Sequence, residues 1–209
     1  MGFYFDKVTK KDRYGDEYTE TRIKRGRVIA TIAALAIVII LLISSFTIVP
    51  TGYTGVRITF GQIDTQVVQT GFNWKIPLVQ RISKVNNKQQ DEHFAIKDSK
   101  IWGETAEKVP VYMADVTVTY QISPEKSAWI YANVTDYRST LVSDGIVASA
   151  LKEAAVGLAA EKVTNRGYIE SAATKELQDV LDAKYGSQTV LVINVVINDM
   201  DFEDSYNEA

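Results

Sequence analysis

The longest feature in the hydrophobic pattern is an apolar run from Val28 to Val49 that contains no charged residue. As a helix its 22 residues would be about 33 Å long, slightly more than the roughly 30 Å hydrocarbon core of a bilayer. Helices buried in soluble proteins rarely lack a polar face over this length. The apolar region of a cleaved signal peptide is shorter and ends in small residues. The run therefore predicts a transmembrane helix over residues 28–49 that stays in the protein.

Beyond residue 53 the apolar positions recur with a period of two, which predicts strands in the first half of the remaining chain. The clearest strand covers 111–122. There an apolar set alternates with mostly polar neighbours, and its members are Tyr112, Ala114, Val116, Val118, Tyr120 and Ile122. Ser123-Pro124 predicts a helix start directly after this strand, with the Ser123 hydroxyl as the cap.

The period then changes to about 3.6, which predicts helices. One apolar stripe indicates a helix over residues 136–160, and a second helix begins at the cap Asn165 and ends at Gly186. The run Gln188–Phe202 is dense in Val and Ile, which predicts a strand buried on both faces. Strands, then helices, then one closing strand indicate an α+β domain.

Charge is distributed unevenly on the two sides of the apolar run. Residues 1–27 carry eight Lys or Arg against five acids, and Arg22, Lys24, Arg25 and Arg27 stand immediately before the run. The positive-inside rule then places residues 1–27 in the cytoplasm, or its organellar equivalent. The chain would cross the cell membrane once, and the domain would lie on the outer side. The acidic remainder of the chain argues against nucleic acid as a partner.

The chain offers few groups for catalysis. It has no cysteine and one histidine, His93, which excludes thiol nucleophiles, Cys-ligated metals and His-rich metal sites. Asp91 and Glu92 precede His93, but strand neighbours point to opposite faces and no nucleophile elbow is present. We therefore expect His93 to be an exposed polar residue of a strand.

Two other patterns also fall short of a site. Asp199, Asp201, Glu203 and Asp204 form an acidic cluster, but their spacing fits no calcium loop, and the scattered glycines form no phosphate cradle. The sequence thus predicts no enzyme, no cofactor and no bound metal. Residues expected at the membrane surface are the basic residues before the apolar run and two aromatic residues beyond it, namely Arg22, Lys24, Arg25, Arg27, Tyr53 and Trp74.

A collinear set of short motifs resembles the prohibitin-homology domain of the SPFH, or band 7, family, which includes stomatin, prohibitin, flotillin and the Hfl-type bacterial proteins. The main motifs are Val49–Val56, Phe60-Gly61, Thr70–Pro77 and Ile197–Phe202. The resemblance implies an SPFH domain over 50–202 and the start of a long coiled-coil helix over 203–209. Because family members usually continue through that helix, we expect the sequence to be a truncated form of a longer protein.

The resemblance also implies a function. The chain is similar to prohibitin- and Hfl-like scaffolds. In that family, identical or paralogous subunits form a ring or cage, organise a membrane microdomain and regulate an FtsH-type AAA+ protease. The alternatives are a stomatin- or flotillin-like scaffold with a cytoplasmic domain, and a membrane-tethered module that binds a lipid or small ligand. A membrane-anchored hydrolase is a third class, and it would need His93 or a serine for activity.

Overall fold

The computed structural model describes residues 2–96 and 99–202, and its contacts divide the chain into two compact units. Met1–Thr47 and Trp74–Leu78 form the N-terminal unit, while Ile48–Asn73 and Val79–Ala209 form the main unit. The predicted coiled-coil start at 203–209 lies outside the described residues. The α+β class expected from the sequence is confirmed.

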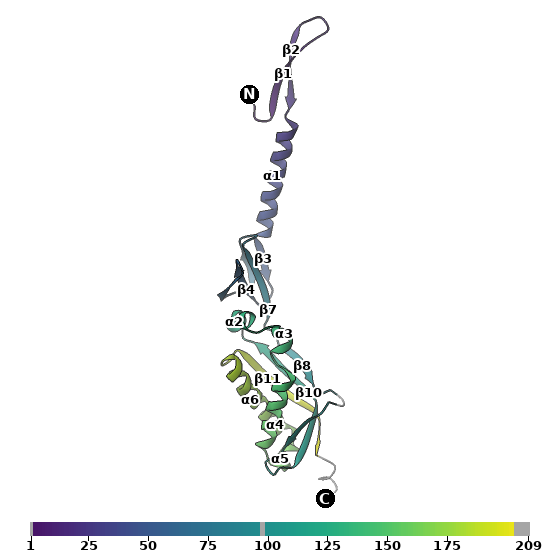
Figure 1. Cartoon of the computed structure of the whole chain (residues 1–209), viewed down its shortest axis with the longest axis vertical. Helices are drawn as coiled ribbons and strands as arrows, with labels where there is room; N and C mark the ends of the chain where they lie inside the picture. The colour runs from purple at the N-terminus through teal and green to yellow at the C-terminus, as the bar shows by residue number, and fades with distance from the viewer. Residues whose placement is uncertain (1, 97–98, 203–209) are drawn as a thin grey trace. The chain divides into compact units, whose positions relative to one another are not determined.

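The N-terminal unit begins with a hairpin that the sequence pattern did not predict. Strands β1 (Phe5–Lys11) and β2 (Glu17–Ile23) are antiparallel (Figure 1). Their turn forms because the Asp12 carboxylate accepts hydrogen bonds from the backbone N–H groups of Tyr14 and Asp16 at 2.7 and 3.0 Å. Gly15 supplies the positive φ of 94° that the turn requires.

Helix α1 (Arg25–Ser44) follows the hairpin, so the helix does not coincide with the apolar run of the sequence. It begins three residues before Val28 and ends before Val49, because Phe46–Val49 form strand β3. The hydroxyls of Ser44 and Ser45 both donate to the Leu41 carbonyl, at 3.0 and 2.7 Å, and occupy a helix-end acceptor. The β-branched residues that follow favour an extended chain. At 20 residues the helix is about 30 Å long, close to the thickness of a hydrocarbon core.

Sheets of three and four strands lie in the main unit. Strand order is β5-β4-β7 in one sheet and β11-β10-β8 in another, where β9 also pairs with β10; β3 pairs with β6. The chain from residue 80 to residue 94 forms two strands, β7 and β8. The strands are β4 (Tyr53–Thr59), β5 (Gln62–Val68), β6 (Gly71–Trp74), β7 (Gln80–Asn86), β8 (Gln90–Phe94), β9 (Ile101–Glu104), β10 (Pro110–Ile122) and β11 (Val190–Phe202).

Strand β10 confirms the predicted alternation over most of its length. Val116, Val118, Tyr120 and Ile122 are buried, but at the start of the strand the buried residues are Val111 and Met113 instead of Tyr112. The inward set changes parity at Asp115, whose φ of 49° breaks the pleat and whose N–H bonds to the Ala95 carbonyl at 2.8 Å.

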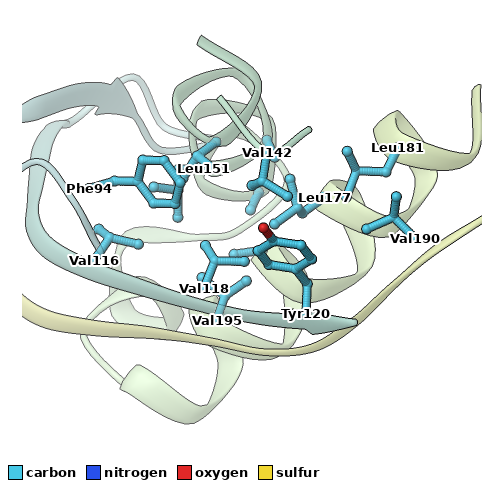
Figure 2. Packing of buried hydrophobic residues seen from close by; sticks show 14 of the residues in the cluster. Phe94, Val116, Val118, Tyr120, Val142, Leu151, Leu177, Leu181, Val190 and Val195 are labelled. Atoms are coloured by element: carbon cyan, nitrogen blue, oxygen red, sulfur yellow. The ribbon is translucent and has the colours of Figure 1, made fainter. Parts of the chain in front are cut away.

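Helices α4 and α6 of the main unit pack their apolar stripes against this sheet. Leu151 of α4 and Leu177 and Leu181 of α6 are almost fully buried, and Figure 2 shows them with the strand residues Val116, Val118 and Val195. The helical segments are η1 (Pro124–Lys126), α2 (Ser127–Asn133), α3 (Tyr137–Thr140), α4 (Asp144–Val156), α5 (Ala160–Val163) and α6 (Arg166–Tyr185).

Both ends of helix α6 lie where the sequence predicted them, whereas the continuous helix over 136–160 and the Ser123 side-chain cap were wrong. The Asn165 side chain accepts a bond from the Gly167 N–H at 3.2 Å, and Gly186 ends α6 with φ 90°. The predicted helix over 136–160 is interrupted, because Ser143 is extended between α3 and α4. Ser123 makes no side-chain cap; its carbonyl instead accepts the Ser127 hydroxyl at 3.2 Å.

Strand β11 was expected to be buried on both faces, and this was wrong. Val195 and Ile197 are buried, while Ile193 is 44% exposed and Asn194 is exposed, because α4 and α6 cover one face of the sheet. Its free edge is bonded by side chains of α6. The N–H groups of Val192, Val195 and Ile197 donate to Gln178, Thr174 and Glu170 at 2.8, 3.2 and 2.9 Å.

Candidate membrane-binding site

Helix α1 is the part of the molecule best suited to a bilayer. Among the described residues it is the one helix long and apolar enough to cross a membrane. No residue of this fully described helix is buried in the protein, whereas a core helix of a soluble domain would be mostly covered. Leu35 and Ile37, near its middle, are 60% and 58% exposed. These apolar side chains need a non-aqueous surrounding, which a lipid bilayer provides.

The four predicted basic residues lie around the first turn of α1. Arg22 and Arg25 line a shared hollow and are exposed. Lys24 forms an ion pair with Asp6 of the hairpin, with Nζ and Oδ1 3.4 Å apart. Arg27 donates to the Phe3 carbonyl at 3.2 Å and lies over the Phe3 ring, 5.5 Å from its centroid. The hairpin thus holds two of the cations at the helix start, while the other two face solvent.

At the other end of α1, Trp74 belongs to a short segment of exposed apolar side chains. The Lys75 N–H donates to the Ser45 carbonyl at 2.7 Å, which fastens this segment to the end of the helix. Trp74 is 57% exposed, and Leu78 is 97% exposed with a φ of 68°. Amphipathic aromatic side chains are favoured at headgroup level, so this arrangement suits a membrane surface.

The sequence pattern did not point to Phe46, Ile76 and Leu78, which are 43%, 41% and 97% exposed in the same unit. A signal for two of them was present, because the string Trp74–Leu78 alternates apolar residues with Lys75 and Pro77. Tyr53, in contrast, belongs to the main unit. It is half-buried there, with Lys88 Nζ 5.4 Å from its ring centroid.

The titratable groups considered for chemistry lie on the sheet surface. His93 is exposed on β8, as expected, and its Nδ1 is 3.0 Å from the Thr117 hydroxyl of β10. The neighbouring Asp91 carboxylate accepts the Thr119 hydroxyl at 2.6 Å. The Asp91 carboxylate and the His93 imidazole thus form cross-strand hydrogen bonds that support the sheet.

The acidic cluster is only partly described. Asp199 and Asp201 are exposed on β11, while Glu203 and Asp204 lie outside the described residues. Within residues 2–96 and 99–202, no group of three or more His, Cys, Asp and Glu side chains is arranged to hold a metal ion.

Comparison with known proteins adds one finding. The model of the family described as SPFH domain / Band 7 matches residues 47–209, more than half of the chain. No curated protein sequence matches the chain significantly. The matched region begins at residue 47, shortly after α1 ends at Ser44. It contains all the motifs that resemble this family, the first of which begins at Val49.

Proposed function

We propose a function from one premise: the chain belongs to the SPFH domain / Band 7 family, whose members are generally membrane scaffolds. The proposal is that the chain is a membrane-anchored, non-enzymatic scaffold whose copies assemble into a large ring or cage. The observation that carries it is the unburied apolar helix α1 directly before the family domain. Such an assembly would enclose a patch of bilayer and act by steric exclusion and avidity.

The surface proposed for contact between copies is the face of the β11-β10-β8 sheet opposite α4 and α6. It presents Ile193, which is 44% exposed, and the partly buried Val196, both on strand β11. A mixed apolar and polar face of this kind is typical of contacts between subunits, and a head-to-tail contact repeated around an axis closes into a ring.

Native mass and electron micrographs of the full chain, extracted in mild detergent, test the assembly. We expect closed particles far larger than a dimer. Ile193→Glu should reduce them to small species, because it buries a charge in the proposed contact. The matched control is Tyr168→Glu, which adds the same charge at a 57% exposed position on α6. A monomeric or dimeric wild type, or equal effects of both substitutions, would contradict the proposal.

The sidedness proposed is a cytoplasmic N-terminal hairpin and an extracytoplasmic domain. It is supported by Arg22, Lys24, Arg25 and Arg27 beside the start of α1. The chain has no cysteine, so single substitutions report cleanly. In intact cells an impermeant thiol reagent should label Ser187→Cys and leave Thr9→Cys unlabelled, both positions being exposed. The opposite labelling would favour a stomatin- or flotillin-like arrangement.

The client proposed is an FtsH-type membrane-bound AAA+ protease whose access to substrates the assembly controls. This rests on likeness to the family, which is an associational argument. After mild crosslinking, the protease should appear in the same particles as the wild-type chain and be lost from Ile193→Glu preparations. Recovery of the large particle without protease would leave the scaffold and refute this client.

A further inference from the structure

The main unit contains a cavity of about 290 Å³ that the scaffold proposal does not use. It lies where strands β4, β7, β8 and the end of β10 meet helix α3. Its walls include Tyr53, Lys84, Gln90, Tyr137 and Arg138, and the ring of Tyr120 closes it on the side of the core. The volume is near the lower end of the range for small-molecule sites.

The walls of this cavity carry two cations and no carboxylate. Lys84 and Arg138 both line it, and among the described residues neither has an ion-pair partner within 4 Å. A hydrogen bond with the Tyr137 side chain holds the guanidinium and raises the pKa of Arg138. The phenolic O–H of Tyr137 stays available as a further donor.

The cavity also contains a donor without an acceptor. Gln90 Nε2 is buried and, within the described part of the chain, has no hydrogen-bond partner. The amide oxygen of Asn86, which also lines the cavity, accepts the Lys88 N–H at 3.1 Å. Buried polar groups in folded proteins are nearly always paired, so an unpaired donor in a cavity wall indicates a missing acceptor.

Local structure fixes the helix that supplies two of these residues. Asp136, directly before α3, has a φ of 47°, a conformation uncommon outside glycine. Its carboxylate accepts the Ser139 hydroxyl at 2.6 Å in an adjoining hollow. This strained turn presents Tyr137 and Arg138 together to the cavity, while the Asp136 carboxylate bonds to Ser139.

We propose that the cavity binds a phosphate group, carried by a small organic phosphate or by a phospholipid headgroup. The walls offer donors from Lys84, Arg138, Gln90 and Tyr137, which is more than the two oxygens of a carboxylate can satisfy with good geometry. A phosphate has three or four acceptor oxygens and carries the negative charge that the two cations complement. Burial, with a smaller contribution from Glu92, raises the pKa of Tyr120 to about 12, so this wall adds no opposing negative charge at neutral pH.

The test uses the full chain in nanodiscs. One arm titrates sn-glycerol 3-phosphate into neutral phosphatidylcholine discs and follows binding by calorimetry and ³¹P NMR. The other arm compares hydrogen exchange of residues 134–140 between phosphatidylcholine discs and discs containing phosphatidylglycerol. Saturable binding in the first arm identifies a free organic phosphate, and protection in the second identifies a headgroup.

Charge-matched variants make the result specific to the cavity. The double variant Lys84→Gln/Arg138→Gln should weaken binding at least tenfold in the first arm, and should abolish the protection in the second arm. The control Arg81→Gln/Lys126→Gln removes the same charge at exposed positions outside the cavity. It should change the binding affinity less than twofold and keep the protection. Gln90→Leu should also weaken binding without lowering the melting temperature of the unliganded chain, because it removes an unpaired buried donor.

Absence of both binding and protection would overturn the proposal. Equal loss in the cavity and control variants would overturn it as well, since binding would then follow net charge. Both readouts are independent of assembly size, so the ring and the cavity can fail separately.

Discussion

The two units of this chain differ in where their side chains find an apolar environment. Helix α1 of the N-terminal unit contains no buried residue, although it is the most apolar segment of the sequence. The main unit buries its own core, with Ile130, Leu141, Leu177 and Ile197 at 1% exposure or less. One unit therefore depends on a lipid solvent, and the other is held together by its own packing.

Apolar side chains therefore contribute to two separate free energies in this chain, that of membrane insertion and that of folding. A polar substitution in α1 changes the free energy of insertion, whereas a cavity in the main unit changes the free energy of unfolding. If the two units are energetically independent, a substitution in one should leave the measured property of the other unchanged. The first two predictions below test that independence, and all four are ordered from the largest expected effect to the smallest.

Substituting Leu35→Asp and Ile37→Asp together should abolish membrane insertion. Each carboxylate near the centre of a span costs about 3 kcal/mol. Alkaline carbonate extraction should move the variant from the membrane pellet to the supernatant, while near-ultraviolet circular dichroism of the main unit stays as in the wild type. Ser44→Asp, at the end of the helix, is the matched control and should remain in the pellet. A variant that loses both insertion and the near-ultraviolet signal would show that the units are coupled.

Leu177→Ala should destabilise the main unit by about 2–5 kcal/mol, because it leaves a cavity beneath α6 where the side chain is 1% exposed. Urea denaturation in detergent, followed by tryptophan fluorescence, measures this loss, and membrane pelleting should not change. Tyr168→Ala on the same helix removes an exposed side chain and should have an effect below about 0.5 kcal/mol. Similar midpoints for the two variants would contradict the core described for the main unit.

Gln178→Ala should cost about 1–3 kcal/mol, since it removes three hydrogen bonds at the edge of the sheet. Gln178 accepts from the Val192 N–H at 2.8 Å and donates to the Val190 carbonyl and to Asp182 at 2.9 and 2.8 Å. The edge of β11 would then present unpaired backbone groups, so light scattering should also rise. Lys175→Ala, one turn away, loses surface ion pairs and should cost less than about 1 kcal/mol.

Glu107→Gln should have the smallest effect, and the effect should depend on pH. The Ala160 N–H donates to the Glu107 carboxylate at 2.8 Å, and this bond is the main reason why its pKa is lowered from about 4.5. A lowered pKa gives stability that is present above the ordinary value and lost as pH falls through the lowered one. The wild type should therefore melt slightly above the variant at pH 7, and the gap should close as pH falls through the lowered pKa of Glu107. A gap that persists below that pKa would assign the effect to packing instead of charge.

Much of the main fold could be predicted because its signals are local. The period-two pattern of β10, the Asn165 cap and Gly186 are each readable from a few neighbouring residues. The hairpin could not be read in this way, because residues 5–23 are mostly polar and its register depends on the Asp12 turn. The exposed face of β11 was also hidden, since a run of Val and Ile does not say which sheet face the helices cover.

The membrane-binding site and the cavity also differ in how far their signals are local in the sequence. Arg22, Lys24, Arg25, Arg27 and Trp74 could be proposed from the sequence, because the apolar run marks where a membrane surface would lie. The cavity could not be found, because Tyr53, Lys84, Gln90 and Arg138 come from distant parts of the chain. Only the pairing of β4 with β7 and of β8 with β10 brings them together.

The pairing of β10 with β11 has a consequence for synthesis. The register joins Val111 to Phe202, so the central strand of the largest sheet waits for the last strand of the domain. Helix α1 leaves the ribosome long before that strand is made, and contacts between distant residues form slowly. During synthesis α1 is therefore complete while this sheet is still open, and the sheet can close only after β11 has been made.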